Sequence, residues 1–191
     1  MTAGLDVRPA GPKQLEDVVA ILGGHPMACL CQYWRMSSGE YSRAGREARL
    51  EALAAQLGET PAPGMVAYVE GEPAGWVGFG PRQRIERLVR SRTIPALDDL
   101  PVWSVYCFTV RTGFRRQGIA RALLDGVVAY AREQGAPALE AYPVDPGGRR
   151  IHGTAAYVGT LPMFERAGFR RVVETAARSD HLPRVLVRLP L

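Results

Sequence analysis

A run of arginine and glycine at residues 115–121 has the residue types that bind phosphate. It reads Arg115-Arg116-Gln117-Gly118-Ile119-Ala120-Arg121 and lies between a β-rich segment and an amphipathic helical one. The first amides of a helix have no internal partners and carry the positive end of its dipole, so they attract anions. Gly118 lets a phosphate approach the backbone, and the arginines add charge. This context favours an anion site over the simpler alternative, a tight turn that requires glycine.

Several other side chains could move protons at such a site. The candidate bases are Glu70, Glu140, His25 and His152, and the candidate acids or relays are Tyr106, Tyr142, Tyr157 and Cys107. Each candidate also has a structural interpretation, as a turn charge, a loop histidine or a tyrosine at the edge of the core, so the choice among them stays open.

The three cysteines could bind a metal or be buried thiols. Cys29 and Cys31 lie close to His25, but one residue between the cysteines is shorter than usual zinc spacing, and no second ligand pair follows. We therefore expect no metal. An odd number of cysteines without a paired framework is typical of a reducing compartment.

The elements that would position these residues follow from hydrophobic periodicity and turn signals. In chain order they are a strand at 5–10, a helix at 11–22, a helix from the N-cap Ser38 to Leu57, a hairpin of strands at 65–70 and 74–80, a strand at 102–111, a helix at 118–134, a strand at 138–144, a short helix at 160–167, and strands at 169–175 and 184–189. Residues 25–36 and 83–100 are irregular or only partly helical. The order predicts an α/β fold with a mixed sheet in a single domain over residues 1–191.

Length, charge and hydropathy narrow the function classes. The chain has 191 residues, with no apolar run long enough to span a membrane, and Met1 to Ala10 resemble no secretory signal, so we expect a cytoplasmic protein. The net charge of +5 comes almost entirely from scattered arginine, since Lys13 is the only lysine. A nucleic-acid footprint would be a denser stripe, whereas attraction of a small polyanion fits the clusters at 82–92 and 111–121.

The motifs together resemble the Gcn5-related N-acetyltransferase (GNAT) superfamily. The resemblance rests on Cys107-Phe108-Thr109-Val110 through Ala120, the following helix, the strand at 139–144, and Phe164-Glu165-Arg166-Ala167-Gly168-Phe169. The hairpin at 69–75 lies where that family has its second and third strands. The resemblance implies a mostly antiparallel sheet with helices on both faces, a splay between the fourth and fifth strands, and a CoA-binding half at about 102–175.

The same resemblance implies roles for individual residues. The amides of Arg116, Gln117, Gly118, Ala120 and Arg121 would hold the CoA pyrophosphate, with Arg115, Ile119 and Phe164 also in the cofactor site. Val110 would pair with the pantetheine arm like an added strand. The amide of Phe108 would stabilise the oxyanion. The implied function is transfer of an acyl group from acetyl-CoA, or another acyl-CoA, to an amine of a small molecule or a protein. We expect neither a nucleic acid nor a membrane as a partner, and the sequence leaves open whether the protein forms a homodimer.

Three positions depart from the family's pattern. Ser104 stands where many members have a glutamate base, Phe164 where many have a tyrosine that protonates the thiolate, and Tyr157 near a common asparagine. Glu140, Tyr142 and Tyr157 are therefore the catalytic candidates besides Phe108. A regulatory acyl-CoA-binding module without turnover is the alternative that these departures would explain. Tyr33, Trp34 and Trp103 suggest an apolar acceptor pocket, with ordinary core packing as the other interpretation.

Overall fold

The strands form one seven-stranded sheet in the order β1-β2-β3-β4-β5-β7-β6. The computed structural model describes residues 4–149, 151 and 156–191. Every neighbouring pair of strands is antiparallel except β4 and β5, which are parallel. The strands are β1 (Leu5–Pro9), β2 (Gly64–Val69), β3 (Glu72–Pro81), β4 (Trp103–Val110), β5 (Ala138–Ala141), β6 (Arg170–Ser179) and β7 (Leu182–Pro190). This is the mixed, mostly antiparallel sheet that the sequence predicts.

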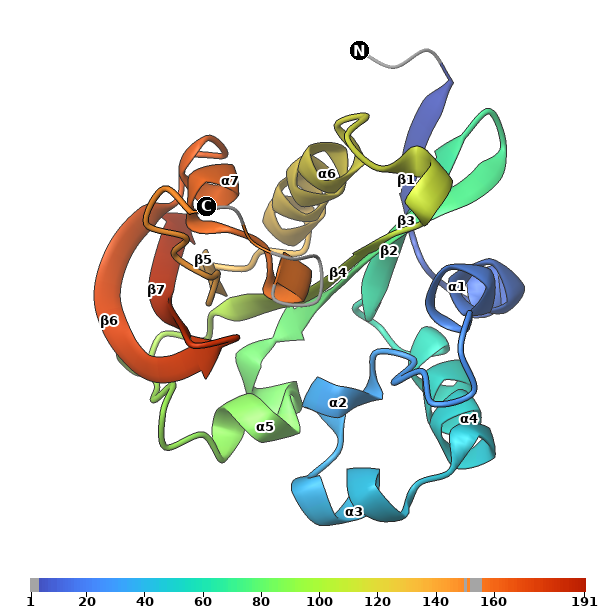
Figure 1. Cartoon of the computed structure of the whole chain (residues 1–191), viewed down its shortest axis with the longest axis horizontal. Coiled ribbons are helices and arrows are strands. Elements are labelled where there is room, and N and C mark those ends of the chain that lie inside the picture. Colours follow the sequence, from blue (N-terminus) through green and yellow to red (C-terminus); the bar gives the residue numbers. More distant parts are fainter. Residues whose placement is uncertain (1–3, 150, 152–155) are drawn as a thin grey trace.

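Helices cover both faces of this sheet (Figure 1). They are α1 (Leu15–Leu22), α2 (Gln32–Arg35), α3 (Ser38–Arg43), α4 (Arg46–Leu57), α5 (Glu86–Val89), α6 (Ile119–Glu133) and α7 (Leu161–Glu165). On one face, Leu123 and Val127 of α6 belong to the same apolar cluster as Val77 of β3. On the other face, Val18 of α1 lies in a second cluster with Trp76. Alternate residues of the central strands, such as Trp76 and Val77 of β3, lie in opposite clusters, so both faces of the middle of the sheet are buried.

β4 pairs with β5 only along its first three residues. Trp103–Val105 pairs with Leu139–Ala141, after which β4 continues to Val110 while β5 ends. The predicted strand at 138–144 is thus too long. The reason is Pro143, which has no amide hydrogen for the ladder, and Val144 forms isolated bridges to Thr160 and Arg184 instead. Beyond Val105 the edge of β4 faces the expected splay.

A bulge in β4 changes which face its side chains take. Val105 pairs with Phe79 and Cys107 with Gly78, so Tyr106 is the extra residue. Tyr106 and Cys107 consequently lie in one apolar cluster, whereas Val105 and Phe108 lie in the other. Bulges re-aim side chains in this way next to functional sites.

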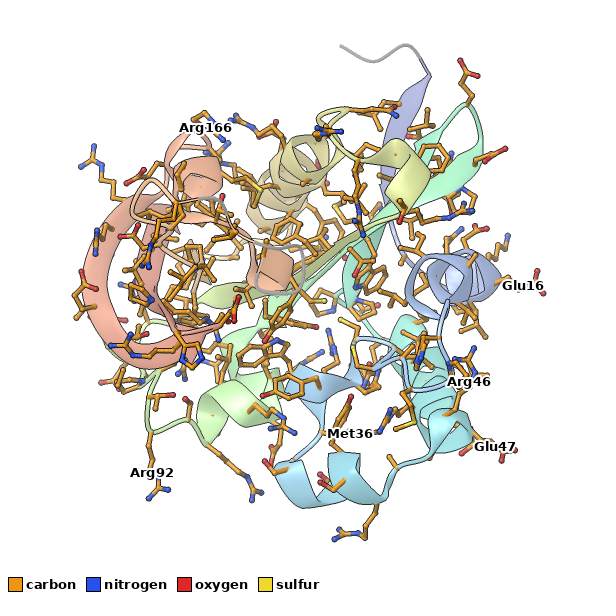
Figure 2. All side chains as sticks on the ribbon, in the orientation of Figure 1. Glu16, Met36, Arg46, Glu47, Arg92 and Arg166 are labelled. Carbon is orange, nitrogen blue, oxygen red and sulfur yellow. The ribbon has the colours of Figure 1, made fainter. Side chains whose placement is uncertain are left out.

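The helical region before β2 differs from its prediction. The single helix expected from Ser38 to Leu57 is two helices, because Gly45 is extended and begins α4. The N-cap is Ser37 rather than Ser38: the Ser37 hydroxyl accepts from the Glu40 amide, and the Glu40 carboxylate accepts from the Ser37 amide. Arg46 at the start of α4 donates to the carbonyls of Gly23 and His25 and so fixes the loop that follows α1 (Figure 2). Within the described ranges, no helix has the length and apolar character needed to cross a bilayer.

Candidate functional site

A cavity of about 540 Å³ lies at the splay of the sheet. Its walls come from the end of β4, the loop into α6, the first turn of α6, the turn at Ala156–Val158 and α7. The lining residues are Phe108, Thr109, Val110, Phe114, Arg115, Arg116, Gly118, Ile119, Ala120, Arg121, Ala156, Tyr157, Thr160, Met163 and Arg166. We call this cavity the groove. It brings together Phe108, Val110 and six of the seven predicted residues of the 115–121 run.

The amides of Phe108 and Val110 point toward the groove side of β4. The amide of Arg111 donates to the carbonyl of Ala74, on the β3 side. Because N–H groups alternate along a strand, those of Phe108 and Val110 face the opposite edge, where β5 has ended. The Val110 carbonyl faces the same way, since it accepts a 3.2 Å hydrogen bond from the Arg115 side chain. The structure therefore presents a strand edge to the groove.

The loop into α6 has two residues in the left-handed region. Arg116 has a φ of 63° and Gly118 a φ of 81°, and Gly118 is the N-cap without any side-chain cap. The first turn of α6 contains no acidic residue. A Cβ atom built on Gly118 meets nothing within 4 Å. The start of α6 is thus an uncapped helix end, open to the groove, which is a setting that attracts anions.

Three arginines in this loop and in the first turn of α6 differ in the hydrogen bonds that their side chains make. Arg115 donates to the Val110 carbonyl. Arg121 donates to both oxygens of the Asp125 carboxylate and to the carbonyl of Arg166, which ends α7 (Figure 2). Arg116 is exposed, and its side chain has no hydrogen-bond or ion-pair partner among the described residues. Of these three arginines, Arg116 is therefore free to meet an anion, and the other two are fixed beside it.

Phe164 lies behind the groove rather than in its wall. Its ring is fully buried and packs edge-on against Phe108 and Phe169, with ring centroids 6.0 and 5.0 Å away. The Phe108 ring is buried on the same face as α6. Phe164 thus supports the residue whose amide faces the groove, and its predicted contact with a cofactor stays a prediction.

Glu140 and Tyr142 form a buried network away from the groove. The Glu140 side chain accepts from Arg188 at 2.9 and 2.6 Å and from the Tyr142 hydroxyl at 3.1 Å. Tyr142 also contacts the Ser104 hydroxyl and accepts from Arg82, both at 3.3 Å. Burial raises the pKa of Tyr142 to about 12. Both oxygens of the carboxylate are engaged, so these contacts favour a structural role for Glu140 in joining β4, β5 and β7.

Tyr157 is the predicted catalytic tyrosine that lines the groove. Burial raises its pKa to about 12, and the charge of Arg184 opposes a further rise. Tyr157 belongs to the turn at Ala156–Val158, which packs in the same apolar cluster as Cys107. At neutral pH its hydroxyl is protonated, so Tyr157 can act as a proton donor.

The remaining candidate groups lie apart from the groove. Glu70 is exposed in the β2–β3 turn, His25 is exposed in the loop after α1, and His152 lies outside the described residues. The hydroxyl of Tyr106 accepts from Arg35 at 2.7 Å. Among the described residues no group of three or more His, Cys, Asp or Glu side chains could hold a metal ion.

Two of the cysteines are buried side by side, as the simpler interpretation predicts. A hydrogen bond between Cys31 and Cys107 lowers the pKa of the Cys31 thiol and raises that of Cys107, and the charge of Arg35 adds to the first effect. The Cys31 sulfur also accepts from the Trp76 indole at 3.3 Å. Cys29 is only half-buried.

A second cavity, of about 380 Å³, is built by the two irregular segments of the sequence. Residues from 33–38 and 86–94 form its walls with Ala176, Ala177, Arg178 and Arg184. We call it the arginine cavity. Tyr33 and Trp34 line it, and their expected part in an acceptor pocket stays a prediction, whereas Trp103 is buried on the other face of the sheet against Phe79. Sequence reasoning missed Arg184, although a lone arginine between Leu182 and Val185 in a buried strand is a signal for it.

Both a family model and solved structures are similar to this chain. Residues 29–169 match the model of the acetyltransferase (GNAT) family. No curated protein sequence matches the chain. Among solved structures, the Gcn5-related N-acetyltransferase of Kribbella flavida is similar with 16% identity, 98% coverage of both chains and a TM-score of 0.61.

Two further similar structures contain a cofactor. The Salmonella typhimurium protein YncA, solved with its cofactor acetyl-CoA, has 16% identity and a TM-score of 0.60, covering 98% of this chain and 94% of that chain. A chain of the NatC complex bound to Gag peptide and CoA has 13% identity and a TM-score of 0.59, with 98% coverage of each. At these identities the structures support the fold, and the family match extends over most of the sequence. The chain belongs to the acetyltransferase (GNAT) family.

Proposed function

We propose that the groove binds acetyl-CoA, or a related acyl-CoA, and that the protein transfers the acyl group to an amine. The observation that carries this proposal is the joint placement of two polar features on one groove. A strand edge with the amides of Phe108 and Val110 faces it from one side. The uncapped start of α6 at Gly118 faces it from the other. An elongated ligand with an amide-containing arm and a pyrophosphate matches both.

The groove has the chemistry to hold each part of such a ligand. The amides of Arg116, Gln117, Gly118, Ala120 and Arg121 would bind the pyrophosphate, helped by the free Arg116 side chain. Ile119 and Ala120 would contact the apolar part near the helix start. Val110 would exchange backbone hydrogen bonds with the pantetheine amides, as an added strand does. The solved complex of YncA with acetyl-CoA supports this class of cofactor.

In the proposed reaction an amine nitrogen attacks the thioester carbonyl carbon. A C–N bond forms, the C–S bond breaks, and the nitrogen loses one proton while the departing thiolate gains one. The products are an N-acyl amine and the free thiol. The amide of Phe108 would donate to the oxyanion of the tetrahedral intermediate, and donors of this kind are typically worth about 2.7–4 kcal/mol.

Tyr157 is the side chain we propose for protonating the thiolate. It lines the groove, and its pKa of about 12 keeps the hydroxyl protonated at neutral pH. Roles in proton transfer for Glu140 and Tyr142 stay predictions, and their burial away from the groove argues against direct contact with substrate. No carboxylate lines the groove among the described residues. The amine would then lose its proton to water.

The acceptor is proposed to enter from the arginine cavity. Tyr33 and Trp34 give this cavity aromatic walls, and Tyr157 lies close enough to Arg184 for the arginine's charge to affect its pKa. A small-molecule amine suits a cavity at the small end of ligand pockets. A peptide amine is the other proposed class, which the similarity to the NatC complex bound to Gag peptide supports. The unpaired thiols support a reducing, cytoplasmic location.

The test is release of the CoA thiol from acetyl-CoA with a panel of amines, with product masses measured in parallel. We expect at least one amine to gain an acetyl group at a rate well above the reaction without enzyme. Binding of acetyl-CoA without release for any small or peptide amine would contradict the proposed transfer.

A regulatory acyl-CoA-binding module is the second candidate. The absence of a carboxylate from the groove lining, among the described residues, favours it, because many transferases need a base. The two candidates differ in one observable. Both predict that acetyl-CoA stabilises the fold, but only the enzyme releases the thiol.

A further inference from the structure

The arginine cavity contains an unusual concentration of unsatisfied donors. Four buried side-chain nitrogen or oxygen atoms lack a hydrogen-bond partner among the described residues, and all four are N–H donors. Three of them, Trp34 Nε1, Arg87 Nε and Arg184 Nη2, belong to residues that line this one cavity. Buried donors are nearly always paired in native proteins, so a cluster of exceptions at one cavity makes that cavity the first place to look for a polar ligand.

Among these three residues, Arg184 has the charge that the fold compensates least. It is 4% exposed, and its Nε donates to the Tyr142 carbonyl at 2.8 Å. None of the ion pairs among the described residues includes it, and its guanidinium carbon lies over the Trp34 ring, 5.1 Å from the ring centroid. Burial accordingly lowers the pKa of its guanidinium. A buried charge without a counter-ion is unfavourable, and an anionic ligand relieves the cost.

A neighbouring arginine shows the contrast. Arg82 is also buried and also contacts Tyr142, through the hydroxyl. Its Nη2, however, donates to the carbonyls of Leu88 and Ile94 at 3.1 and 2.9 Å. The fold thus satisfies these donors of one buried arginine, through the Tyr142 hydroxyl and two backbone carbonyls, and leaves Nη2 of the other without a hydrogen-bond partner among the described residues.

The local backbone makes room at Arg184. Glu174 pairs with Val185 and Arg178 with Pro183, so the three residues 175–177 of β6 oppose the single residue Arg184 of β7. Two of those three are the alanines Ala176 and Ala177, which line the cavity beside it. The bulge and the small side chains leave space next to the guanidinium instead of filling it.

The lining of the arginine cavity carries a net positive charge. Four arginines, at 87, 90, 178 and 184, line the cavity with one acid, Glu86, and that acid is paired with Arg90. The Arg87 guanidinium lies 4.0 Å from the Tyr33 ring centroid, and its Nη1 donates to the Ser38 hydroxyl. The excess of positive charge repels cationic amines and attracts amines that carry an anion.

We propose that the acceptor is a small amine that carries a carboxylate or a phosphate, and that Arg184 binds this anionic group in the arginine cavity. The proposal rests on the proposed function and names its substrate class. A guanidinium fits both oxyanions through paired N–H donors, and Trp34 adds a third donor from the wall. The amine end would then extend past Tyr157 toward the groove.

The experiment compares matched acceptors that differ only in charge. The pairs are γ-aminobutyrate with its carboxamide, para-aminomethylbenzoate with its carboxamide, and phosphoethanolamine with ethanolamine, each assayed for thiol release from acetyl-CoA. We expect kcat/KM for the anionic member to exceed that of its neutral partner by about 30-fold or more in at least one pair. The carboxylate and phosphate arms identify which oxyanion is preferred.

Three variants locate the effect. Arg184→Gln should reduce the preference to about 3-fold or less, and Arg184→Lys should keep part of it. Arg87→Gln, which leaves β7 untouched, should weaken it by a smaller factor. Arg171→Gln on β6, where the arginine is paired with Asp145 and Glu174, is the control and should preserve it. An unchanged shift of the melting temperature by acetyl-CoA shows that each variant is folded.

A binding measurement separates this proposal from the transferase activity. Sodium benzoate should raise the melting temperature of the wild type more than benzamide does, and Arg184→Gln should abolish the difference. Equal effects of benzoate and benzamide, or equal or better turnover of neutral amines, would overturn the proposal while leaving the transferase intact. No thiol release with any amine, together with a benzoate effect that depends on Arg184, would overturn the proposed transfer and leave the anion site standing.

Discussion

Phe108 and Phe164 pack edge to face with ring centroids 6.0 Å apart, and this contact joins the proposed oxyanion donor to α7. Phe164 is fully buried. The Phe164→Tyr variant would therefore place a hydroxyl among apolar rings, which typically costs about 1–3 kcal/mol when no partner is found. We expect a lower melting temperature, retained binding of acetyl-CoA and no gain in kcat. An unchanged melting temperature with a faster kcat would instead mean that the hydroxyl reaches the thiolate.

Tyr157 should be required for rapid turnover. Removing a general acid typically lowers kcat by about 10²–10⁴-fold, and Tyr157→Phe tests this with little change in shape. Because burial raises the pKa of Tyr157 to about 12, its hydroxyl stays protonated through pH 10. The rate should therefore rise with pH as the acceptor amine loses its proton and should not fall before pH 10. A loss of kcat between pH 8 and 10 in the folded enzyme would contradict this assignment.

The pKa of Tyr157 also sets the sign of its effect on stability. The pKa is raised in the folded state, from an ordinary value of 10. Its contribution to the free energy of unfolding is thus fully present below pH 10 and is lost as the pH rises toward 12. Tyr157→Phe should make the decline of melting temperature above pH 10 shallower than in the wild type.

Arg188 should matter far more to stability than its surface partner. The Glu140 side chain is 1% exposed, and Arg188 is its cationic partner. Arg188→Met would leave a buried, uncompensated charge, and such losses typically amount to about 3–5 kcal/mol. Asp98, the other partner of Arg188, is 44% exposed, so Asp98→Asn should change the melting temperature little. Similar losses in both variants would show that the Glu140 contact is not the important one.

The Glu140→Gln variant tests whether the Glu140 carboxylate is a catalytic base. Because both carboxylate oxygens already accept hydrogen bonds from Arg188 and Tyr142, we expect kcat for folded protein to change by less than about 3-fold. A fall of 100-fold or more, the range expected for loss of a base, would give Glu140 a catalytic role.

Trp34 should affect the acceptor and not the cofactor. Trp34→Phe keeps an aromatic wall but removes the unpartnered Nε1 donor. A hydrogen bond to a charged group contributes roughly 1.5–3 kcal/mol, so the acceptor KM should rise about 10-fold or more with acetyl-CoA affinity unchanged. The control is Trp103→Phe, on the opposite face against Phe79. Equal changes in the two variants would remove Trp34 from the acceptor site.

The sequence predicted the elements with strong periodicity and the positions of the groove residues. The 118–134 pattern and its flanking glycines locate α6 within a residue, because local spacing and caps decide a helix. The split of the helix at Gly45 and the early end of β5 at Ala141, two residues before Pro143, were missed, since both depend on local backbone conformation that periodicity does not encode.

The arginine cavity could not be predicted because it is a tertiary feature. It joins α2 and α5 to a bulge in β6, and nothing local to Arg184 reveals that its Nη2 lacks a partner. For the same reason, the engagement of Glu140 could not be predicted, because its partner Arg188 is 48 residues away along the chain.

The most direct test of the central claim is acetyl-CoA binding by two matched glycine variants. Gly118 and Gly135 lie at the two ends of α6 with φ of 81° and 73°, and a Cβ on either meets nothing within 4 Å. Both alanine variants therefore carry similar backbone strain, of about 1–2 kcal/mol, but only Gly118 lines the groove. We predict that Gly118→Ala weakens the dissociation constant for acetyl-CoA by about 10-fold or more, whereas Gly135→Ala leaves it at the wild-type value. Equal affinity in both variants, each folded, would contradict binding of acetyl-CoA at the start of α6.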